Sequence, residues 1–87
     1  MDLQNYRNQI DRIDNDILRL FKERMDVCFQ IAQYKKEHNL PALDAEREKE
    51  KLTVIGENVS SELRPYAHSL FTTVFELSRL YQKETLL

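Results

Sequence analysis

An apolar stripe at helical spacing runs through the first 37 residues of the chain. Its side chains recur every three or four positions, which is the period of an amphipathic α-helix. They are Leu3, Tyr6, Ile10, Ile13, Ile17, Leu20, Phe21, Met25, Cys28, Ile31 and Ala32. Asp2 can serve as the N-cap, and Pro41 ends the helix because the residue before a proline is pushed out of the α conformation. The sequence therefore predicts one helix over residues 2–37.

This helix is too long for a compact monomer of 87 residues. About 35 residues at about 1.5 Å each span roughly 50 Å. A globular chain of this length has a radius of gyration of about 12 Å and hence a diameter near 30 Å. The apolar stripe would extend well beyond the rest of the molecule. Because a second copy is the simplest cover for such a stripe, we predict an intertwined homodimer.

Two further helices are predicted in the rest of the chain. The second begins after the N-cap Asp44, carries an apolar face and ends in the turn-forming stretch 56–61. The third begins between Ser61 and Pro65, since proline is tolerated in a first helical turn, and runs to about Thr85. Its apolar side comprises Ala67, Leu70, Phe71, Val74, Phe75 and Tyr81. With one Gly and two Pro in the whole chain, the fold class is all-α, with three helices in the order long, short, long.

Composition narrows the possible functions. The net charge of −2 gives no basic surface for nucleic acid. No apolar run approaches the roughly 20 residues that cross a bilayer, and the polar N-terminus lacks the apolar stretch of a signal peptide. The single cysteine, Cys28, lies among apolar residues, which indicates a core position, and it forms no metal-ligand cluster with His38 or His68. We expect one cytoplasmic domain, residues 1–87, without a metal ion or cofactor.

Seven polar residues interrupt or border the predicted apolar faces; they are Arg24, Lys35, Asp44, Arg47, Glu48, Ser78 and Gln82. Lys35 follows Arg24 by 11 residues, a rotation of about 1,100° that returns it to within about 20° of the same direction. Their Cα atoms would lie about 16 Å apart along the helix. Two long cationic side chains on one face can hold a small anion between them. Ser78 and Gln82, at i and i+4, share a face of the third helix.

Each of these residues also has an ordinary structural interpretation. Arg24 could extend to water from the rim of the stripe. Ser78 could return its hydroxyl to its own helix, Asp44 could simply cap a helix, and Glu48 could pair with Lys49 or Lys51 in solvent. Seven such exceptions on three helices together favour a site. Unpaired buried charges are costly, and polar clusters inside small helical bundles are typical of functional sites.

The complete pattern resembles the active site of the all-helical chorismate mutases. The matching residues are Arg7, Arg24, Lys35, Asp44-x-x-Arg47-Glu48 and Ser78-x-x-x-Gln82. The opening Arg7-x-x-Ile10-Asp11-x-x-Asp14-x-x-Ile17-x-x-Leu20 is similar to the first helix of that family, and the match covers essentially the whole chain. The resemblance implies an isomerase that rearranges chorismate to prephenate in phenylalanine and tyrosine biosynthesis. Such an enzyme needs no cofactor, because it holds a chair-like conformer and stabilises developing charge.

The resemblance also implies roles for the residues. Lys35 and Gln82 would donate hydrogen bonds to the ether oxygen as it gains negative charge. Arg24 would clamp one substrate carboxylate and Arg7 the other, since a guanidinium matches a carboxylate bidentately. Arg7 lies about 25 Å from Arg24 along the same helix and about 100° around it. The resemblance therefore places Arg7 in the site of the partner subunit.

The remaining residues would complete the site. Glu48 would accept a hydrogen bond from the ring hydroxyl, Asp44 and Arg47 would order the start of the second helix, and Ser78 would hold a carboxylate. Two other functions stay open. A lyase on the same fold that eliminates pyruvate from isochorismate would share the cations and Gln82, but it would not resemble the segment 44–48. A non-catalytic helical dimerisation module would need the apolar stripes but gives no reason for inward polar residues.

Overall fold

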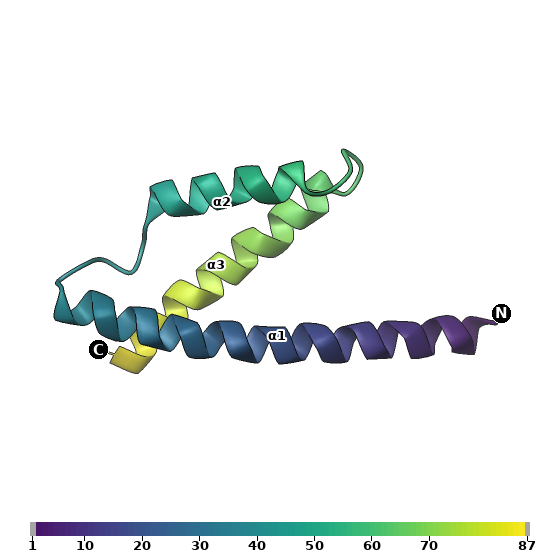
Figure 1. Ribbon diagram of the computed structural model, residues 1–87, viewed down its shortest axis with the longest axis horizontal. Helices are drawn as coiled ribbons and strands as arrows, with labels where there is room; N and C mark the ends of the chain where they lie inside the picture. Colours follow the sequence, from purple (N-terminus) through teal and green to yellow (C-terminus); the bar gives the residue numbers. More distant parts are fainter. Residues whose placement is uncertain (1, 87) are drawn as a thin grey trace.

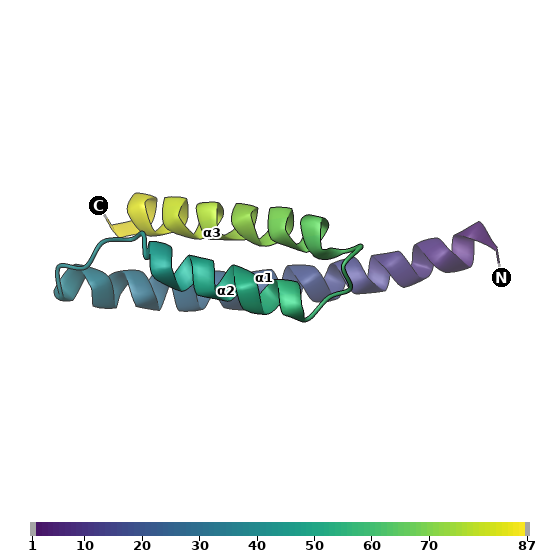
Figure 2. The ribbon, with the colours of Figure 1, turned by 90° about the horizontal axis from the view of Figure 1, so that it is seen from above.

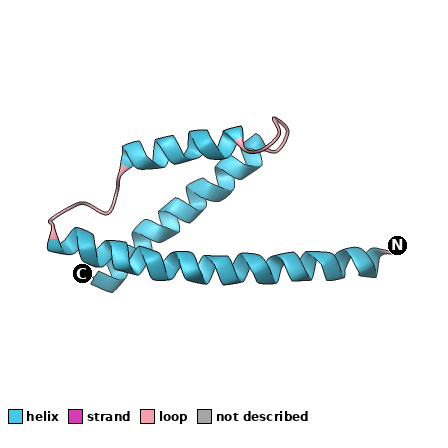
Figure 3. Ribbon diagram, in the orientation of Figure 1, coloured by secondary structure: helices cyan, strands magenta, loops and turns pink. Residues whose placement is uncertain are grey.

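The computed structural model describes residues 2–86, which form three helices joined by two connections (Figures 1 and 3). They are α1 (Leu3–Glu37), α2 (Ala45–Glu57) and α3 (Arg64–Leu86). No strand occurs within this part of the chain. The predicted all-α class and the order of a long, a short and a long helix are confirmed, and the helix boundaries lie within a few residues of the predicted ones.

The two ends of α1 are fixed by different local interactions. At the start, the Asp2 carboxylate accepts a hydrogen bond from the backbone N–H of Asn5 at 2.9 Å, as predicted for an N-cap. At the end, Asn39 adopts a left-handed conformation with φ 56°. The N–H of Leu40 then donates to the Lys35 carbonyl at 2.8 Å, which closes a Schellman motif. The helix thus ends at Glu37, as predicted, and the left-handed Asn39 follows it two residues before the predicted breaker Pro41.

The central element of the arrangement is α3. It packs against both α1 and α2, whereas α1 and α2 make no close backbone contact with each other within the described chain. Figure 2 shows α2 and α3 side by side along the C-terminal half of α1. Where α2 turns into α3, Arg64 Nε donates to the Gly56 carbonyl at 2.9 Å and ties the two helices together.

The N-terminal half of α1 projects beyond the other two helices, as Figures 1 and 2 both show. The molecule measures 54 × 26 × 15 Å with a radius of gyration of 16.0 Å, against about 12 Å for a globular chain of this length. The apolar side chains of this half are 44–61% exposed; they are Leu3, Tyr6, Ile10, Ile13, Ile17 and Leu20. One chain therefore does not cover its own stripe.

The core is small and lies where the C-terminal half of α1 meets α3. Its buried apolar residues are Cys28, Ala32 and Phe75, so the predicted core position of Cys28 is confirmed. Leu70 was expected on the apolar side of the third helix, but it is exposed. It belongs instead to a second apolar row on the outer face of α3, because the helix turns its packed face toward α1 and α2; the other large members of this row are Tyr66, Leu77 and Leu80.

None of the three described helices combines the length and the apolar character needed to cross a membrane.

Candidate active site

A cavity of about 190 Å³ lies between the C-terminal half of α1, the start of α2 and the C-terminal half of α3. Its walls are formed by Arg24, Cys28, Ile31, Lys35, Ala42, Asp44, Arg47, Glu48, Lys51, Phe75, Ser78, Arg79 and Gln82. Seven of the eight residues singled out in the sequence are in this lining, and Arg7 is the exception. Polar side chains from three separate helices thus converge on one hollow.

Arg24 lies across the contact between α1 and α3. Its Nη1 donates a hydrogen bond to Ser78 Oγ and lies 3.5 Å from Cys28 Sγ. Its guanidinium carbon lies 5.7 Å from the centre of the Phe75 ring, within the range of a cation–π interaction. The side chain is half-buried and does not extend freely to water. A guanidinium held in this way is preorganised to meet an anion in the cavity.

Ser78 fills two roles at once. Its hydroxyl donates to the Val74 carbonyl of its own helix at 2.8 Å, as the ordinary structural interpretation predicted. The same oxygen accepts the hydrogen bond from Arg24, and Ser78 is the buried polar residue of the core. In the last turn of α1, Lys35 Nζ donates to the Ala42 carbonyl at 3.0 Å. An ammonium group has three N–H donors, so two remain for a ligand.

The start of α2 supplies the acidic wall of the cavity. Asp44 caps the helix, with Oδ1 accepting from the Arg47 backbone N–H at 3.1 Å. Glu48 was expected either in the site or paired in solvent with a neighbouring lysine; the lysine pairing is wrong. Both oxygens of Glu48 accept hydrogen bonds from Nη1 of Arg79 on α3. The two side chains are each 25% exposed, so the pair is partly buried in the cavity wall.

Sequence reasoning missed Arg79 as a cavity residue. Its i,i+3 spacing to Gln82 puts both on neighbouring positions of one helix face, and this signal could have found it. Gln82 itself presents an unusual group. Its side-chain oxygen Oε1 is buried without a hydrogen-bond partner among residues 2–86. Buried polar atoms are nearly always paired, so an unpaired amide oxygen in a cavity wall is suited to accepting a hydrogen bond from a ligand.

Arg7 stands apart from the other predicted site residues. It lies on the projecting half of α1, where its side chain is exposed, and it does not border the cavity. The 17 residues that separate it from Arg24 correspond to about 25 Å of helix. A single chain therefore does not bring Arg7 to the other seven residues.

Comparison with known proteins agrees with this geometry. The profile of the family described as chorismate mutase type II matches residues 6–83 of the chain. The chain belongs to this family. The match confirms the resemblance to the chorismate mutases that the sequence shows.

Several curated relatives have chorismate mutase in their names. A "Bifunctional chorismate mutase/prephenate dehydratase" of Buchnera aphidicola subsp. Schizaphis graminum is 38% identical over 98% of this chain and 23% of its own length. The protein of the same name from Buchnera aphidicola subsp. Acyrthosiphon pisum is 40% identical over 93% of this chain and 22% of its own. A "Chorismate mutase" of Methanocaldococcus jannaschii is 43% identical over 54% of this chain and 48% of its own. The chain thus spans less than a quarter of the length of the two bifunctional relatives. No solved structure gives a significant match.

The cavity between the three helices has an excess of positive charge. Its lining contains five cationic residues, Arg24, Lys35, Arg47, Lys51 and Arg79, against the two carboxylates of Asp44 and Glu48, a net of +3. Among residues 2–86, no group of three or more His, Cys, Asp or Glu side chains is arranged to hold a metal ion. Such a cavity suits a small molecule that carries two negative charges.

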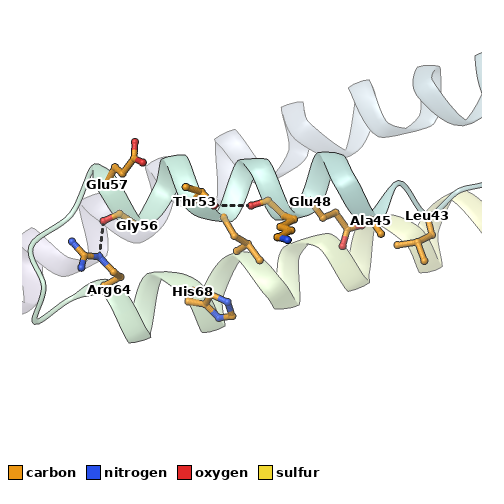
Figure 4. Close-up of a pocket in the computed structure, with 10 residues that line it drawn as sticks. Leu43, Ala45, Glu48, Thr53, Gly56, Glu57, Arg64 and His68 are labelled. Atoms are coloured by element: carbon orange, nitrogen blue, oxygen red, sulfur yellow. Dashed lines mark hydrogen bonds between the residues drawn. The ribbon is translucent and has the colours of Figure 1, made fainter.

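A larger groove of about 740 Å³ runs along α2 and the start of α3 (Figure 4). It is lined by Leu43, Ala45, Glu48, Lys49, Leu52, Thr53, Gly56, Glu57, Arg64 and His68. Glu48 is the one predicted site residue that borders it, and α1 contributes nothing to its walls. Size alone does not make it the active site. The smaller cavity unites polar groups from three helices, whereas this groove is largely one face of α2.

Proposed function

We propose that this chain catalyses the rearrangement of chorismate to prephenate. One observation carries the proposal: seven residues of the family pattern, spread over three helices, line a single cavity with a net charge of +3. Chorismate has two carboxylates, a ring hydroxyl and an ether oxygen. The charge of the cavity matches the carboxylates, and the convergence of donors suits an oxygen that gains negative charge.

In this reaction the ether C–O bond breaks as a new C–C bond forms within the same molecule. No nucleophile and no proton transfer are needed. Catalysis therefore comes from holding the folded conformer and from stabilising charge on the ether oxygen. Lys35 and Gln82 are the donors for that oxygen. The ammonium of Lys35 keeps two N–H groups beyond its bond to Ala42. The side chain of Gln82 lines the same cavity, and its amide NH2 group can donate.

The other residues bind and orient the substrate. Arg24, already oriented by Ser78, holds one carboxylate. Ser78 can donate to the same carboxylate when its hydroxyl hydrogen turns away from the Val74 carbonyl. Glu48 accepts a hydrogen bond from the ring hydroxyl. Asp44 and Arg47 fix the first turn of α2 through the cap bond at 3.1 Å, which sets where Glu48 stands in the wall.

The second carboxylate is bound by Arg7 of a partner chain in an intertwined homodimer. Two observations support this part of the proposal. The projecting half of α1 exposes a continuous apolar stripe that a second α1 can cover. Arg7 lies about 25 Å from the site of its own chain, so an antiparallel partner helix is required to bring one in. Residues 1–87 form one mutase domain, and the unpaired thiol of Cys28 fits a reducing cytoplasm.

An assay with two substrates tests the proposal. The purified chain is expected to convert chorismate to prephenate, followed by the loss of chorismate absorbance, and to release no pyruvate from isochorismate. Pyruvate from isochorismate without prephenate from chorismate would instead identify the lyase on the same fold. Activity on neither substrate by a folded dimer would leave the non-catalytic dimerisation module.

A further inference from the structure

Arg79 of α3 is a charged cavity residue to which the proposed function gives no role. It stands next to Ser78 in sequence and reaches across the cavity wall to α2. A single nitrogen, Nη1, donates to both oxygens of Glu48, so the carboxylate is held from one side only. A carboxylate has about four acceptor positions, and two therefore stay free.

We propose that Arg79 is a positioning residue that aims the Glu48 carboxylate at the ring hydroxyl of the substrate. This inference rests on the proposed function and names a determinant of how the substrate is oriented. The first support is that other cationic side chains compete with Arg79 for the Glu48 carboxylate. Lys51 lines the same cavity, one turn after Glu48 on α2, and Lys49 follows Glu48 directly. Without Arg79, nearby ammonium groups could draw the glutamate away from the cavity.

The second support is that the Glu48–Arg79 ion pair is not needed to stabilise the fold. A partly exposed ion pair contributes little to stability, because water and salt screen it. The α2–α3 contact has other sources. Leu52 and Ile55 of α2 are half-buried, and Arg64 bonds the Gly56 carbonyl at the turn. What the Glu48–Arg79 pair does fix is the direction of one carboxylate in the wall of the cavity.

The test compares two substrates on matched variants. The first substrate is chorismate, and the second is an analogue in which hydrogen replaces the ring hydroxyl. Arg79→Met removes the cation while keeping the length of the side chain, and Arg79→Lys keeps the charge. Arg19→Met is the control, because it breaks the exposed pair with Asp16 on α1, outside the cavity. Far-UV circular dichroism establishes the temperature range in which each variant is folded.

With chorismate, Arg79→Met is expected to raise KM about tenfold to a hundredfold with a smaller change in kcat, since a hydrogen bond made in both ground and transition state is lost. Arg79→Lys should recover most of this loss, and Arg19→Met should behave as wild type. With the analogue, wild type and Arg79→Met should have nearly the same KM, because Glu48 then has no hydroxyl to accept from. If Arg79→Met is unfolded at the assay temperature, Arg79→Gln replaces it.

Two results would overturn the inference while wild type still turns over chorismate. An unchanged KM for chorismate in a folded Arg79→Met or Arg79→Gln variant would make the pair only structural. An equal KM penalty with both substrates would place Arg79 on a substrate carboxylate and not on Glu48. Failure of the proposed function itself looks different, because wild type would then convert no chorismate.

Discussion

Lys35 is the single side chain on which the chemistry proposed here depends most. It lies in the last turn of α1, where its ammonium reaches the connection to α2 and bonds the Ala42 carbonyl at 3.0 Å. In the proposed mechanism a remaining N–H meets the ether oxygen, where its contribution grows as the C–O bond breaks. An interaction that strengthens in the transition state raises kcat and leaves substrate binding nearly unchanged.

We therefore expect Lys35→Ala to lower kcat by about 10²–10³ with a much smaller change in KM, the loss typical of a donor to a developing oxyanion. The exposed neighbour Lys36 supplies the control, because Lys36→Ala removes the same charge from the same turn outside the cavity. Steady-state kinetics with chorismate measure both variants. A Lys35→Ala enzyme with normal kcat and only a raised KM would put Lys35 at the rim of the site.

Gln82 gives a prediction that depends on pH. An amide donates a hydrogen bond without titrating, and the proposed reaction needs no proton transfer, so wild-type activity should be nearly flat from about pH 5 to about pH 8. The substitution Gln82→Glu replaces the amide by a carboxyl group that donates only when protonated. Its reference pKa is about 4.3; burial and the substrate carboxylates act to raise this pKa, whereas the cationic side chains of the cavity act to lower it.

The direction in which the activity of Gln82→Glu changes with pH follows from these properties. At about pH 7.5 the ionised carboxylate of the Gln82→Glu variant would repel the developing negative charge, and lowering the pH to about 5 should restore the donor and the rate. Activity relative to wild type is measured at both pH values. An equal ratio at the two would mean that Gln82 does not touch the ether oxygen.

At the scale of the helices, the boundaries depend on a few local interactions that sequence can reveal. The caps Asp2 and Asp44 were predicted, and both accept the expected backbone N–H bonds. The partner of Glu48 was not predictable, because Arg79 lies 31 positions away and only the packing of α3 on α2 brings the two together. The bond from Arg24 to Ser78 likewise joins residues 54 positions apart.

Packing between distant segments, which the sequence does not reveal, also decides that Leu70 lies on the outer face of α3. The spacing of Leu70 suits either of two apolar rows on that helix, and the periodicity of a helix with apolar residues on two sides does not say which row packs inward. Function was more accessible than packing. The spacing of the polar residues along the chain was sufficient to recognise the family, although it gave no contact among them.

The end of α1 offers a test of the element boundaries. Asn39 has φ 56°, where a side chain with a Cβ is strained and asparagine is tolerated better than alanine. Asn39→Ala should lower the free energy of unfolding by about 1 kcal/mol, whereas Asn39→Gly should keep or raise it. Urea denaturation at fixed protein concentration measures both.

The matched control is Asn58, which follows α2 with φ −97° and donates from its side chain to the Val54 carbonyl. Asn58→Gly should gain nothing, because its backbone does not need a left-handed conformation. Equal stabilities of Asn39→Ala and Asn39→Gly would contradict the Schellman account of the end of α1.

At the scale of the whole molecule, one chain provides most of the site residues but leaves the apolar stripe of α1 uncovered. The cavity holds seven of the eight predicted residues, while the eighth, Arg7, lies on a projecting helix half whose apolar side chains are 44–61% exposed. In the proposed homodimer, an antiparallel second copy accounts for both the exposed stripe and the distant Arg7. It would cover the stripe and bring the partner's α1 past the cavity. The proposed site is therefore complete only in the proposed dimer.

Mixing two inactive variants tests this claim most directly. Arg7→Ala and Arg24→Ala should each be nearly inactive as homodimers, because every site then lacks one carboxylate clamp. In a heterodimer one site has both arginines and the other has neither, so each heterodimer should have about half of the wild-type activity. A 1:1 mixture that exchanges subunits at random, and so holds about half heterodimers, should reach about a quarter. Activity that stays at the level of the single variants, although heterodimers are detected by mass, would contradict the shared site.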